Sequence, residues 1–311
     1  MIIVQKVNKF FGDFRALNDI SFEICKGEIV GFLGQNGAGK TTLMRILTSY
    51  YLATSGKVEI DGNDIVRHSL LCRKKIGYLP ENPPLYMNLT VRDYLKYSAS
   101  LKDVEIKKQK MQVDRVLDDC NLKDVQNKHI SILSKGYKQR VGIAQSIIND
   151  PQVLILDEPT IGLDPLQILQ VRQLIKRIED KRTVIISTHI LSEIEQIAKR
   201  VLVIKNGEIL IDRPISVLLD EENISRFVFV VKGDRNEIEK VFINSKEIIS
   251  ESFDSCGDVH SVKVKVLQNW TNHNELIHKI IRAKAELVEV KKLKPTLEEV
   301  FISKVSNQYI K

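Results

Sequence analysis

The sequence predicts an α/β domain with a largely parallel sheet, followed by a small α+β domain. In the first part of the chain, short and almost wholly apolar segments alternate with segments whose apolar residues recur at helical spacing. Segments that are apolar throughout are typical of strands buried on both faces, as in parallel sheets. Near Pro214 this alternation stops and a β-α-β-β-α-β order begins, which is typical of a ferredoxin-like unit. We therefore expect domains of residues 1–215 and 216–311.

The strands of the first domain are predicted from runs of β-branched and apolar residues that end in turns. An Asp-Gly pair at residues 61–62 and an Asn-Gly pair at residues 206–207 predict hairpin turns. Helices are predicted from apolar residues at intervals of three and four, and the highly charged segment 90–126 is mostly helical in pattern. The predicted strands are residues 2–10, 17–24, 28–33, 57–62, 153–156, 183–187 and the hairpin 201–211, and the predicted helices are residues 40–51, 137–149, 165–180 and 191–200.

The second domain is predicted from the same two patterns in a different order. Its last helix is expected to start at Pro295, because proline is favoured in the first turn of a helix. The predicted strands are residues 226–231, 247–253, 259–266 and 286–293, and the predicted helices are residues 236–244, 274–285 and 295–305.

The composition excludes several classes of protein. Of the 311 residues, 43% are hydrophobic and 28% are charged, which is ordinary for a soluble globular protein. No apolar run approaches the ~20 residues that span a bilayer, and the N-terminus lacks a signal-peptide pattern, so we expect a cytoplasmic protein. The net charge of +7 comes from lysines that are spread along the chain, so no nucleic-acid partner is expected. Four scattered cysteines predict free thiols.

A glycine-rich loop stands between the predicted strand 28–33 and the predicted helix 40–51. Residues 34–41 fit the pattern GxxxxGK[ST], which requires this strand-loop-helix context. The glycines let backbone N–H groups point at phosphate oxygens, and the helix N-terminus adds a partial positive charge there. Lys40 can reach the β- and γ-phosphates, and the hydroxyl of Thr41 can ligate Mg²⁺. The predicted phosphate-binding residues are Gly34, Asn36, Gly37, Ala38, Gly39, Lys40, Thr41 and Thr42.

Two acidic residues, Asp157 and Glu158, follow the apolar strand 153–156. Ligands of parallel α/β sheets bind at the carboxyl edge of the strands, so both carboxylates are expected beside the phosphate loop. Asp157 can hold Mg²⁺, as the corresponding aspartate does in P-loop nucleotide hydrolases. Glu158 can accept a proton from an attacking water. Together the loop and the acids predict a hydrolase of a nucleoside triphosphate.

A Ser/Gly turn at residues 133–137 opens the helix upstream of those acids. With this turn included, residues 1–215 resemble the ATP-binding subunits of ABC transporters. Residues 34–42 are similar to the family's Walker A loop, residues 133–137 with the following Lys-Gln-Arg to its signature sequence, and residues 162–164 to its D-loop. The resemblance implies a P-loop, ABC-type ATPase domain with a helical subdomain at about residues 85–150, and it implies ATP and Mg²⁺ as cofactors.

The resemblance also implies roles for individual residues. Phe11, in KFFGDFRAL, takes the place of the aromatic residue that stacks on adenine. Asp157 and Glu158 correspond to the Walker B aspartate and the catalytic glutamate, and His189, in ISTHIL, corresponds to the switch histidine. In the family two chains stack head to tail with two ATP molecules between them. The residues implied to act across that interface are Ser134, Gly136 and Asp164.

The chain departs from the family pattern at the signature and before the helical subdomain. The usual signature reads LSGGQ, and here Lys135 and Tyr137 replace a glycine and the glutamine. Glu81, in IGYLPENPPLY, replaces a glutamine and so places a carboxylate near Mg²⁺. These departures, and the segment PTLEEVFI at 295–302, are similar to the subgroup that serves drug, polysaccharide and gliding-motility exporters. In that subgroup a small domain follows the ATPase domain.

Because no membrane span is predicted, the work of ATP hydrolysis must be delivered to a partner. The resemblance implies an integral-membrane permease, contacted around the loop 81–89, and a peripheral place on the cytoplasmic face of the cell membrane. It also implies a homodimer, or a heterodimer with a related ATPase. Two alternatives stay open, which are a soluble ABC ATPase acting on ribosomes or DNA and an ATP-dependent regulatory module. A single ATPase domain without heptads argues against the first, and Glu158 argues against the second.

Overall fold

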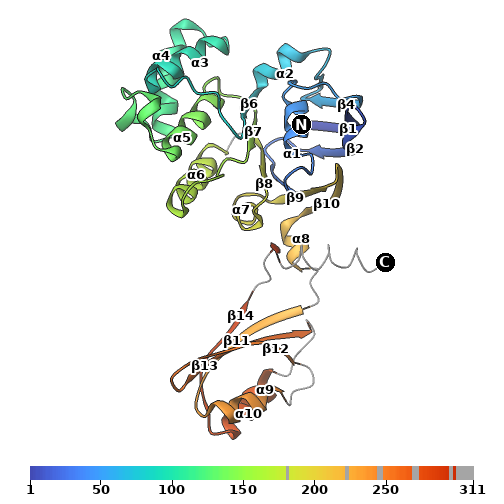
Figure 1. Cartoon of the computed structure of the whole chain (residues 1–311), viewed down its shortest axis with the longest axis vertical. Helices are drawn as coiled ribbons and strands as arrows, with labels where there is room; N and C mark the ends of the chain where they lie inside the picture. The colour runs from blue at the N-terminus through green and yellow to red at the C-terminus, as the bar shows by residue number, and fades with distance from the viewer. Residues whose placement is uncertain (180–181, 221–223, 244–247, 268–272, 294–296, 299–311) are drawn as a thin grey trace. The chain divides into compact units, whose positions relative to one another are not determined.

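The computed structural model describes the chain except for residues 180–181, 221–223, 244–247, 268–272, 294–296 and 299–311 (Figure 1). The chain divides into two compact units, Met1–Pro214 and Ile215–Lys311. Each unit has its own hydrophobic cluster of buried side chains, so each is described separately.

The centre of the first unit is a six-stranded sheet with the order β10-β9-β3-β8-β7-β6. Only the hairpin partner β10 is antiparallel, and all the other neighbours are parallel. Every residue of β3, β7 and β8 is buried, as expected for strands covered on both faces. The strand bounds are β3 Ile29–Leu33, β6 Ile76–Leu79, β7 Val153–Asp157, β8 Thr183–Thr188, β9 Arg200–Lys205 and β10 Glu208–Pro214.

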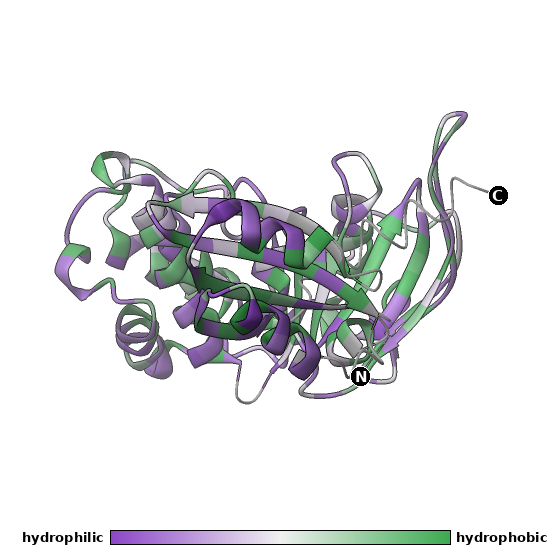
Figure 2. Cartoon of the chain, turned by 90° about the horizontal axis from the view of Figure 1, so that it is seen from below, coloured by the Kyte–Doolittle hydropathy of each residue, from purple (hydrophilic) through white to green (hydrophobic). Residues whose placement is uncertain are grey.

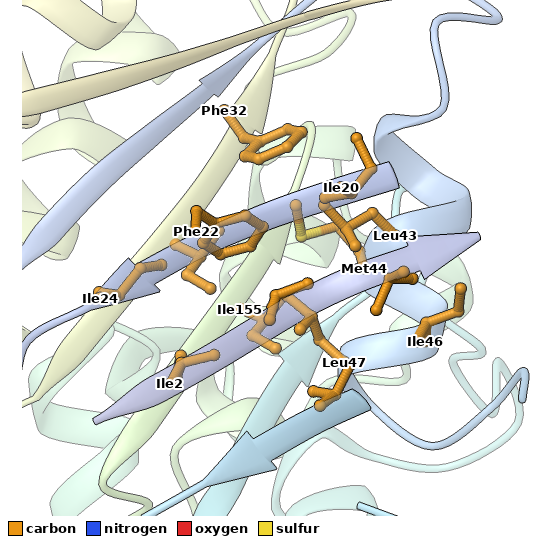
Figure 3. Packing of buried hydrophobic residues seen from close by; sticks show 14 of the residues in the cluster. Ile2, Ile20, Phe22, Ile24, Phe32, Leu43, Met44, Ile46, Leu47 and Ile155 are labelled. Carbon is orange, nitrogen blue, oxygen red and sulfur yellow. The ribbon is translucent and has the colours of Figure 1, made fainter. Parts of the chain in front are cut away.

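A separate four-stranded antiparallel sheet, with the order β2-β1-β4-β5, lies in the same unit. Its strands are β1 Ile2–Phe11, β2 Phe14–Ile24, β4 Ser55–Ile60 and β5 Asn63–Asp64. The two sheets enclose helix α1 (Lys40–Leu47), and Figure 3 shows Leu43, Met44 and Leu47 of this helix among side chains from both sheets. Each large side chain buried in this way contributes about 1.5–3 kcal/mol. This core therefore fixes the start of α1 relative to the strand ends.

The helices of the first unit fall into two groups. Helices α3 (Val91–Leu101), α4 (Ile106–Asp119) and α5 (Lys135–Ser146) contact one another and form a helical region (Figure 1). Helices α6 (Pro165–Ile178) and α7 (Leu191–Ile197) contact each other, and α7 packs on β3 and β8. Figure 2 shows alternating hydrophilic and hydrophobic segments along the helices, which is the pattern of helices with one buried face.

The structure corrects several predicted boundaries. The helix expected over 40–51 ends at Leu47, because Thr48 caps it and Ser49 has a left-handed backbone with φ 58°. The helix expected over 191–200 ends at Ile197, because Arg200 already pairs in β9. Helix α2 (Ser69–Lys75) and strand β6 were not predicted, since both are too short for a clear periodic pattern.

The second unit begins with α8 (Ile215–Asp220) and continues in the order β-α-β-β-α-β. Its antiparallel sheet has the order β12-β13-β11-β14, and α9 and α10 contact each other. Phe229 of β11 and Phe242 of α9 are in edge-to-face contact at 5.5 Å in its core. The expected helix 295–305 lies mostly outside the described residues. The bounds are β11 Ile224–Lys232, α9 Arg235–Ile243, β12 Ile248–Cys256, β13 Val259–Leu267, α10 His273–Arg282 and β14 Glu286–Leu293.

Candidate functional site

The glycine-rich loop packs tightly between β3 and α1. A Cβ atom on Gly34 would lie 2.6 Å from the carbonyl oxygen of Ile204, so no larger residue fits there. Gly39, with φ 110°, is the N-cap of α1 and would collide with the backbone of Ala16 if it had a side chain. Helix α1 has no side-chain N-cap. Its first N–H groups are therefore available to an anion, and the helix dipole favours one there.

The ammonium group of Lys40 lies at the same place and is almost fully buried. It donates hydrogen bonds to the carbonyl oxygens of Gly34 at 2.7 Å and Gln35 at 3.2 Å. Its third close partner is the carboxylate of Glu158, at 3.4 Å. Both side chains of this ion pair are only 6% exposed. The loop thus holds a positive charge next to a carboxylate at the end of β7.

Asp157 is fully buried at the carboxyl end of β7. One of its oxygens, Oδ1, accepts hydrogen bonds from the hydroxyls of Ser187 and Thr41, the latter at 3.5 Å. The other oxygen, Oδ2, is buried and has no hydrogen-bond partner among the described residues. A buried carboxylate oxygen without a donor is costly unless a cation binds it. Burial and the nearby negative charge of Asp157 together raise the pKa of Tyr78 to about 12, so this neighbour stays neutral.

Glu158 is in direct contact with His189. The ring Nδ1 of His189 lies 2.9 Å from Oε2 of Glu158, and the histidine side chain is 38% exposed. The backbone of Glu158 is left-handed, with φ 49°, and its N–H donates to Ser187. Such a conformation costs about 1–3 kcal/mol in a residue other than glycine and persists only where the surroundings hold it. It aims the carboxylate of Glu158 at both Lys40 and His189.

Lys40, Thr41 and Glu158 line a cavity of about 370 Å³. Its volume is within the range of small-molecule binding sites. The residues that line it are Phe11, Phe14, Ala16, Asn36, Gly37, Gly39, Lys40, Thr41, Thr42, Glu81, Glu158 and Ile161. Nine of these were predicted from the sequence, and the structure brings them together from β1, the glycine-rich loop, the segment after β6 and the end of β7.

The aromatic residue at the mouth of the cavity is exposed. Phe11, at the end of β1, is 42% exposed and makes an edge-to-face contact with Tyr51 at 5.4 Å. Phe14, at the start of β2, lines the same cavity and is 65% exposed. An exposed ring beside a phosphate-binding loop can stack on a nucleotide base. Phe14 was not predicted, although it lies in the same aromatic stretch of the sequence.

Seven predicted residues are not among those that line the cavity. Four of them adjoin lining residues in the chain or contact them, namely Gly34, Ala38, Asp157 and His189. The other three lie close to one another elsewhere. Ser134 is the N-cap of α5, and its hydroxyl accepts from the N–H of Tyr137 at 3.4 Å. Gly136, in the first turn, is packed so closely against Gln167 of α6 that a Cβ atom would collide with it. Asp164 caps α6 by accepting from the N–H of Gln167 at 2.9 Å. The start of α5 and the start of α6 are therefore side by side.

The geometry agrees with comparisons to known proteins. A family model described as "ABC transporter" matches residues 17–161. The uncharacterised ABC transporter ATP-binding protein YcbN of Bacillus subtilis (strain 168) is 33% identical over 306 residues, which cover 98% of this chain and 96% of that protein. The bacitracin transport ATP-binding protein BcrA of Bacillus licheniformis is 38% identical over 220 residues, covering 70% of this chain and 71% of BcrA.

The chain therefore belongs to the ATP-binding proteins of ABC transporters.

A solved structure supports the same assignment. The ATP-binding cassette MJ0796, in a dimeric post-hydrolysis state bound to ADP and Pi, is 26% identical to this ATP-binding protein. The two share a TM-score of 0.63, over 69% of this chain and 99% of MJ0796. The ATP-binding protein is thus an ATPase subunit of a transporter and has the P-loop fold of that family. Within the described part of the chain, no helix has the length and apolar character to span a bilayer.

The sequence missed some residues of the ATP-binding protein's site. Ser187 of β8 pairs with Asp157 of β7 and donates a hydrogen bond to it. The signal that could have indicated this contact is that both residues stand at the ends of predicted strands. Glu193, buried on α7, bonds to Thr160 and Thr188 and could not be placed from a local pattern. Ile161 lines the cavity because of the turn after Glu158. These contacts depend on tertiary packing rather than on a motif.

Proposed function

We propose that the phosphates of ATP bind at the glycine-rich loop and that adenine stacks on Phe11. The first-turn N–H groups of α1 and the ammonium of Lys40 face the cavity that would receive the phosphates. Lys40 is already desolvated and bound by carbonyl oxygens, so it meets a phosphate oxygen without a further cost of burial. The observation that carries the proposal is the convergence of Lys40, Thr41, Glu81 and Glu158 on one cavity.

We propose that Mg²⁺ is held by Thr41 and Asp157, with Glu81 nearby. The buried, unpartnered Oδ2 of Asp157 and the hydroxyl of Thr41 are oxygen donors of the kind that Mg²⁺ prefers. The carboxylate of Glu81 lines the same cavity. When bound, the ion neutralises phosphate charge. The residues present therefore fit a divalent cation.

We propose that Glu158 is the general base and that His189 holds it in place. Glu158 is anchored on one side by Lys40 and on the other by His189, and so its carboxylate has a fixed orientation. Once Lys40 turns to the phosphates, the Oε1 oxygen of Glu158 is left to accept a proton from water. His189 is partly exposed and can contact the γ-phosphate from the same position.

We propose that two copies of the chain assemble head to tail. Ser134, Lys135 and Asp164 lie away from the cavity and are exposed. Beside them, Ile132 and Leu166 are 71% and 66% exposed, so they form an apolar surface next to the N-terminus of α5. The dimeric state of MJ0796 supports a pairing of this kind. In such a dimer Ser134 and Gly136 meet the phosphates bound by the partner, and Asp164 joins the two sites.

A mixing experiment tests this arrangement. Lys40→Ala removes the phosphate-binding ammonium, and Ser134→Ala removes the signature hydroxyl, so each variant alone is expected to be nearly inactive. When the two are mixed, each mixed dimer retains one site in which both groups are intact. ATP hydrolysis should therefore recover to a substantial fraction of the wild-type rate. No recovery at any mixing ratio would contradict shared sites.

We propose that the partner is an integral-membrane permease and that the chain acts at the cytoplasmic face of the membrane in export of the drug, polysaccharide or gliding-motility type. The relatives named for bacitracin and lantibiotic transport, at 38% and 37% identity, support this class. A second cavity, of about 540 Å³, is lined by Tyr50, Leu70 and Leu101 together with the charged residues Arg73, Lys74, Lys102 and Asp103. The exposed side chains of Tyr50, Leu70 and Leu101, and the exposed Tyr86, suit the apolar face of a permease segment.

Fractionation tests the membrane partner. In cells that contain the permease, Leu70→Glu should move the subunit from the membrane to the supernatant, because Leu70 is 67% exposed in the proposed docking cavity. The ATPase rate of the purified subunit should be unchanged. A subunit that stays with the membrane would exclude this surface, and one that instead sediments with ribosomes or DNA would favour a soluble ATPase.

We propose the domain division of residues 1–215 as the ATPase domain, with its helical subdomain at about 85–150, and residues 216–311 as an accessory domain of ferredoxin-like topology. The strand order β12-β13-β11-β14 and the two βαβ connections support that topology. The helices α9 and α10 contact each other, as two helices on one face of a sheet do.

A further inference from the structure

A buried glutamate lies behind the site and is not used by the roles proposed above. Glu193, in the first turn of α7, is 4% exposed. Its Oε2 accepts hydrogen bonds from the hydroxyl of Thr160 at 2.6 Å and from the hydroxyl of Thr188 at 3.2 Å. Its other oxygen, Oε1, is buried and has no hydrogen-bond partner among the described residues. One carboxylate oxygen thus receives both threonine hydroxyls.

The two threonines lie close to the proposed catalytic pair, where β7 and β8 end. Thr160 is two residues after Glu158, and Thr188 directly precedes His189. Both hydroxyls are buried, at 4% and 1% exposure of their residues. Because Glu158 and His189 also contact each other at 2.9 Å, the four residues and Glu193 form a closed ring. A shift of either strand end would therefore stretch a contact on both sides of the ring.

Helix α7 itself has little freedom to move. Gly31 of β3 lies directly beneath Ile194, and even a methyl group on Gly31 would come within 2.4 Å of that side chain. Thr188 also accepts from the N–H of Ile190, at 3.1 Å, and so ties the end of β8 to the start of α7. Glu193 is therefore a fixed acceptor, and the threonines are held by it.

Burial of a carboxylate is costly unless hydrogen bonds to the carboxylate compensate for the lost water. An apolar side chain would fill the same volume without that cost. A buried carboxylate is therefore useful here only if the two threonine hydroxyls require a common acceptor. The left-handed backbone of Glu158 supplies a reason for that requirement, because a strained conformation persists only when its surroundings fix it.

We infer that Glu193 is a positioning residue for ATP hydrolysis, which holds Glu158 and His189 at reacting distance through Thr160 and Thr188. The inference rests on the roles proposed for Glu158 and His189. It does not require Glu193 to touch ATP, because the residue does not line the cavity. Its removal should lower the rate of the chemical step and leave nucleotide binding at Lys40 and Thr41 intact.

The threonines provide the sharper test, because Glu193→Ala leaves two buried hydroxyls without an acceptor and can prevent folding. Thr160→Val and Thr188→Val each remove one hydroxyl at nearly constant volume. A matched control is Thr183→Val, at the other end of β8, where the residue is 2% exposed and its hydroxyl oxygen accepts from the N–H of Gly27 at 3.0 Å. Thr188→Ser restores the hydroxyl and serves as the rescue.

Steady-state hydrolysis by the purified full-length chain separates the possible outcomes. Thr160→Val and Thr188→Val should lower kcat by about ten- to a hundredfold, the effect of a small misplacement of catalytic groups, with KM for ATP changed by less than about twofold. Thr183→Val should lower the melting temperature about as much as the other two valine variants do, but should keep the wild-type kcat. Thr188→Ser should regain most of the wild-type kcat.

Two results would overturn the inference. One is a kcat of both valine variants equal to that of Thr183→Val, which would leave only a structural role. The other is a rise in KM with kcat preserved, which would place the effect in nucleotide binding. Glu158→Gln in the same assay separates this inference from the proposed function. If Glu158→Gln hydrolyses ATP normally, the role proposed for Glu158 is wrong and the inference about Glu193 fails with it. If Glu158→Gln is inactive while the valine variants at 160 and 188 are active, only the positioning role of Glu193 is rejected.

Discussion

The ammonium group of Lys102 is held by two neutral acceptors at the end of α3. The residue caps the C-terminus of α3, and its ammonium donates to the carbonyl oxygen of Ser146 at 3.2 Å and to Oδ1 of Asn149 at 3.3 Å. The adjacent carboxylate of Asp103 pairs with Lys74 instead, at 3.1 Å. Burial lowers the pKa of Lys102 from 10.5 to about 8. The folded state therefore holds this proton less firmly than the unfolded chain does.

The size of the effect follows from that difference in pKa. A drop from 10.5 to about 8 corresponds to about 3 kcal/mol of lost stability at neutral pH. Lys102→Met removes the charge at similar length but also two hydrogen bonds, each worth about 1 kcal/mol. We expect the variant to be more stable than the wild type by about 1–2 kcal/mol at pH 7. The advantage should be constant below pH 8, where Lys102 is charged in both states.

The difference in stability between the wild type and Lys102→Met should change with pH in a defined direction. As the pH rises from about 8 to about 10.5, the folded state has lost its proton and the unfolded state still binds one, so the wild type gains stability relative to Lys102→Met. Urea denaturation followed by circular dichroism at pH 7 and pH 10 measures both free energies. Lys96→Met is the control, because Lys96 lies on the same helix and is 53% exposed. A destabilised Lys102→Met variant, or a difference that does not change with pH, would refute the argument.

Two further predictions concern the accessory unit and the cation site. Phe242→Ala should destabilise the second unit by about 3–5 kcal/mol, because the side chain is 2% exposed and packs on Phe229. The affinity for ATP, measured by fluorescence titration, should not change. A large loss of ATP affinity would mean that the two units depend on each other. Glu81→Gln should raise the Mg²⁺ concentration needed for half-maximal hydrolysis several-fold, because it removes a carboxylate from the cavity; an unchanged Mg²⁺ requirement would exclude Glu81 from the metal site.

Local motifs predicted the parts of the site whose geometry is set by neighbouring residues. The positions of Gly34 and Gly39 demand glycine for steric reasons, so their spacing reveals the loop. Asp157 and Glu158 follow a strand that is apolar throughout, and this pattern places them at the carboxyl edge of a parallel sheet. In both cases the chemistry and the backbone conformation are encoded within about ten residues.

Other parts depend on contacts between distant segments and were missed for that reason. Glu193 is a polar residue in an amphipathic helix, and nothing nearby in the sequence distinguishes it from Glu195 on the same helix, which is only partly buried. Its burial follows from the packing of α7 on Gly31. Similarly, α1 ends four residues earlier than its apolar spacing predicts, because Ser49 turns into the left-handed region. Spacing predicts a helix better than it predicts the end of one.

In the proposed mechanism, ATP is hydrolysed in sites shared between two copies of the chain. Light scattering of Glu158→Gln, with and without MgATP, tests this sharing. The variant keeps Lys40, Thr41 and Ser134 but lacks the proposed base, so ATP should bind and remain uncleaved. We expect the mass of one chain, 35.6 kDa, without nucleotide and twice that mass with MgATP. A variant that stays at the mass of one chain in saturating MgATP and hydrolyses ATP at the wild-type rate would contradict it.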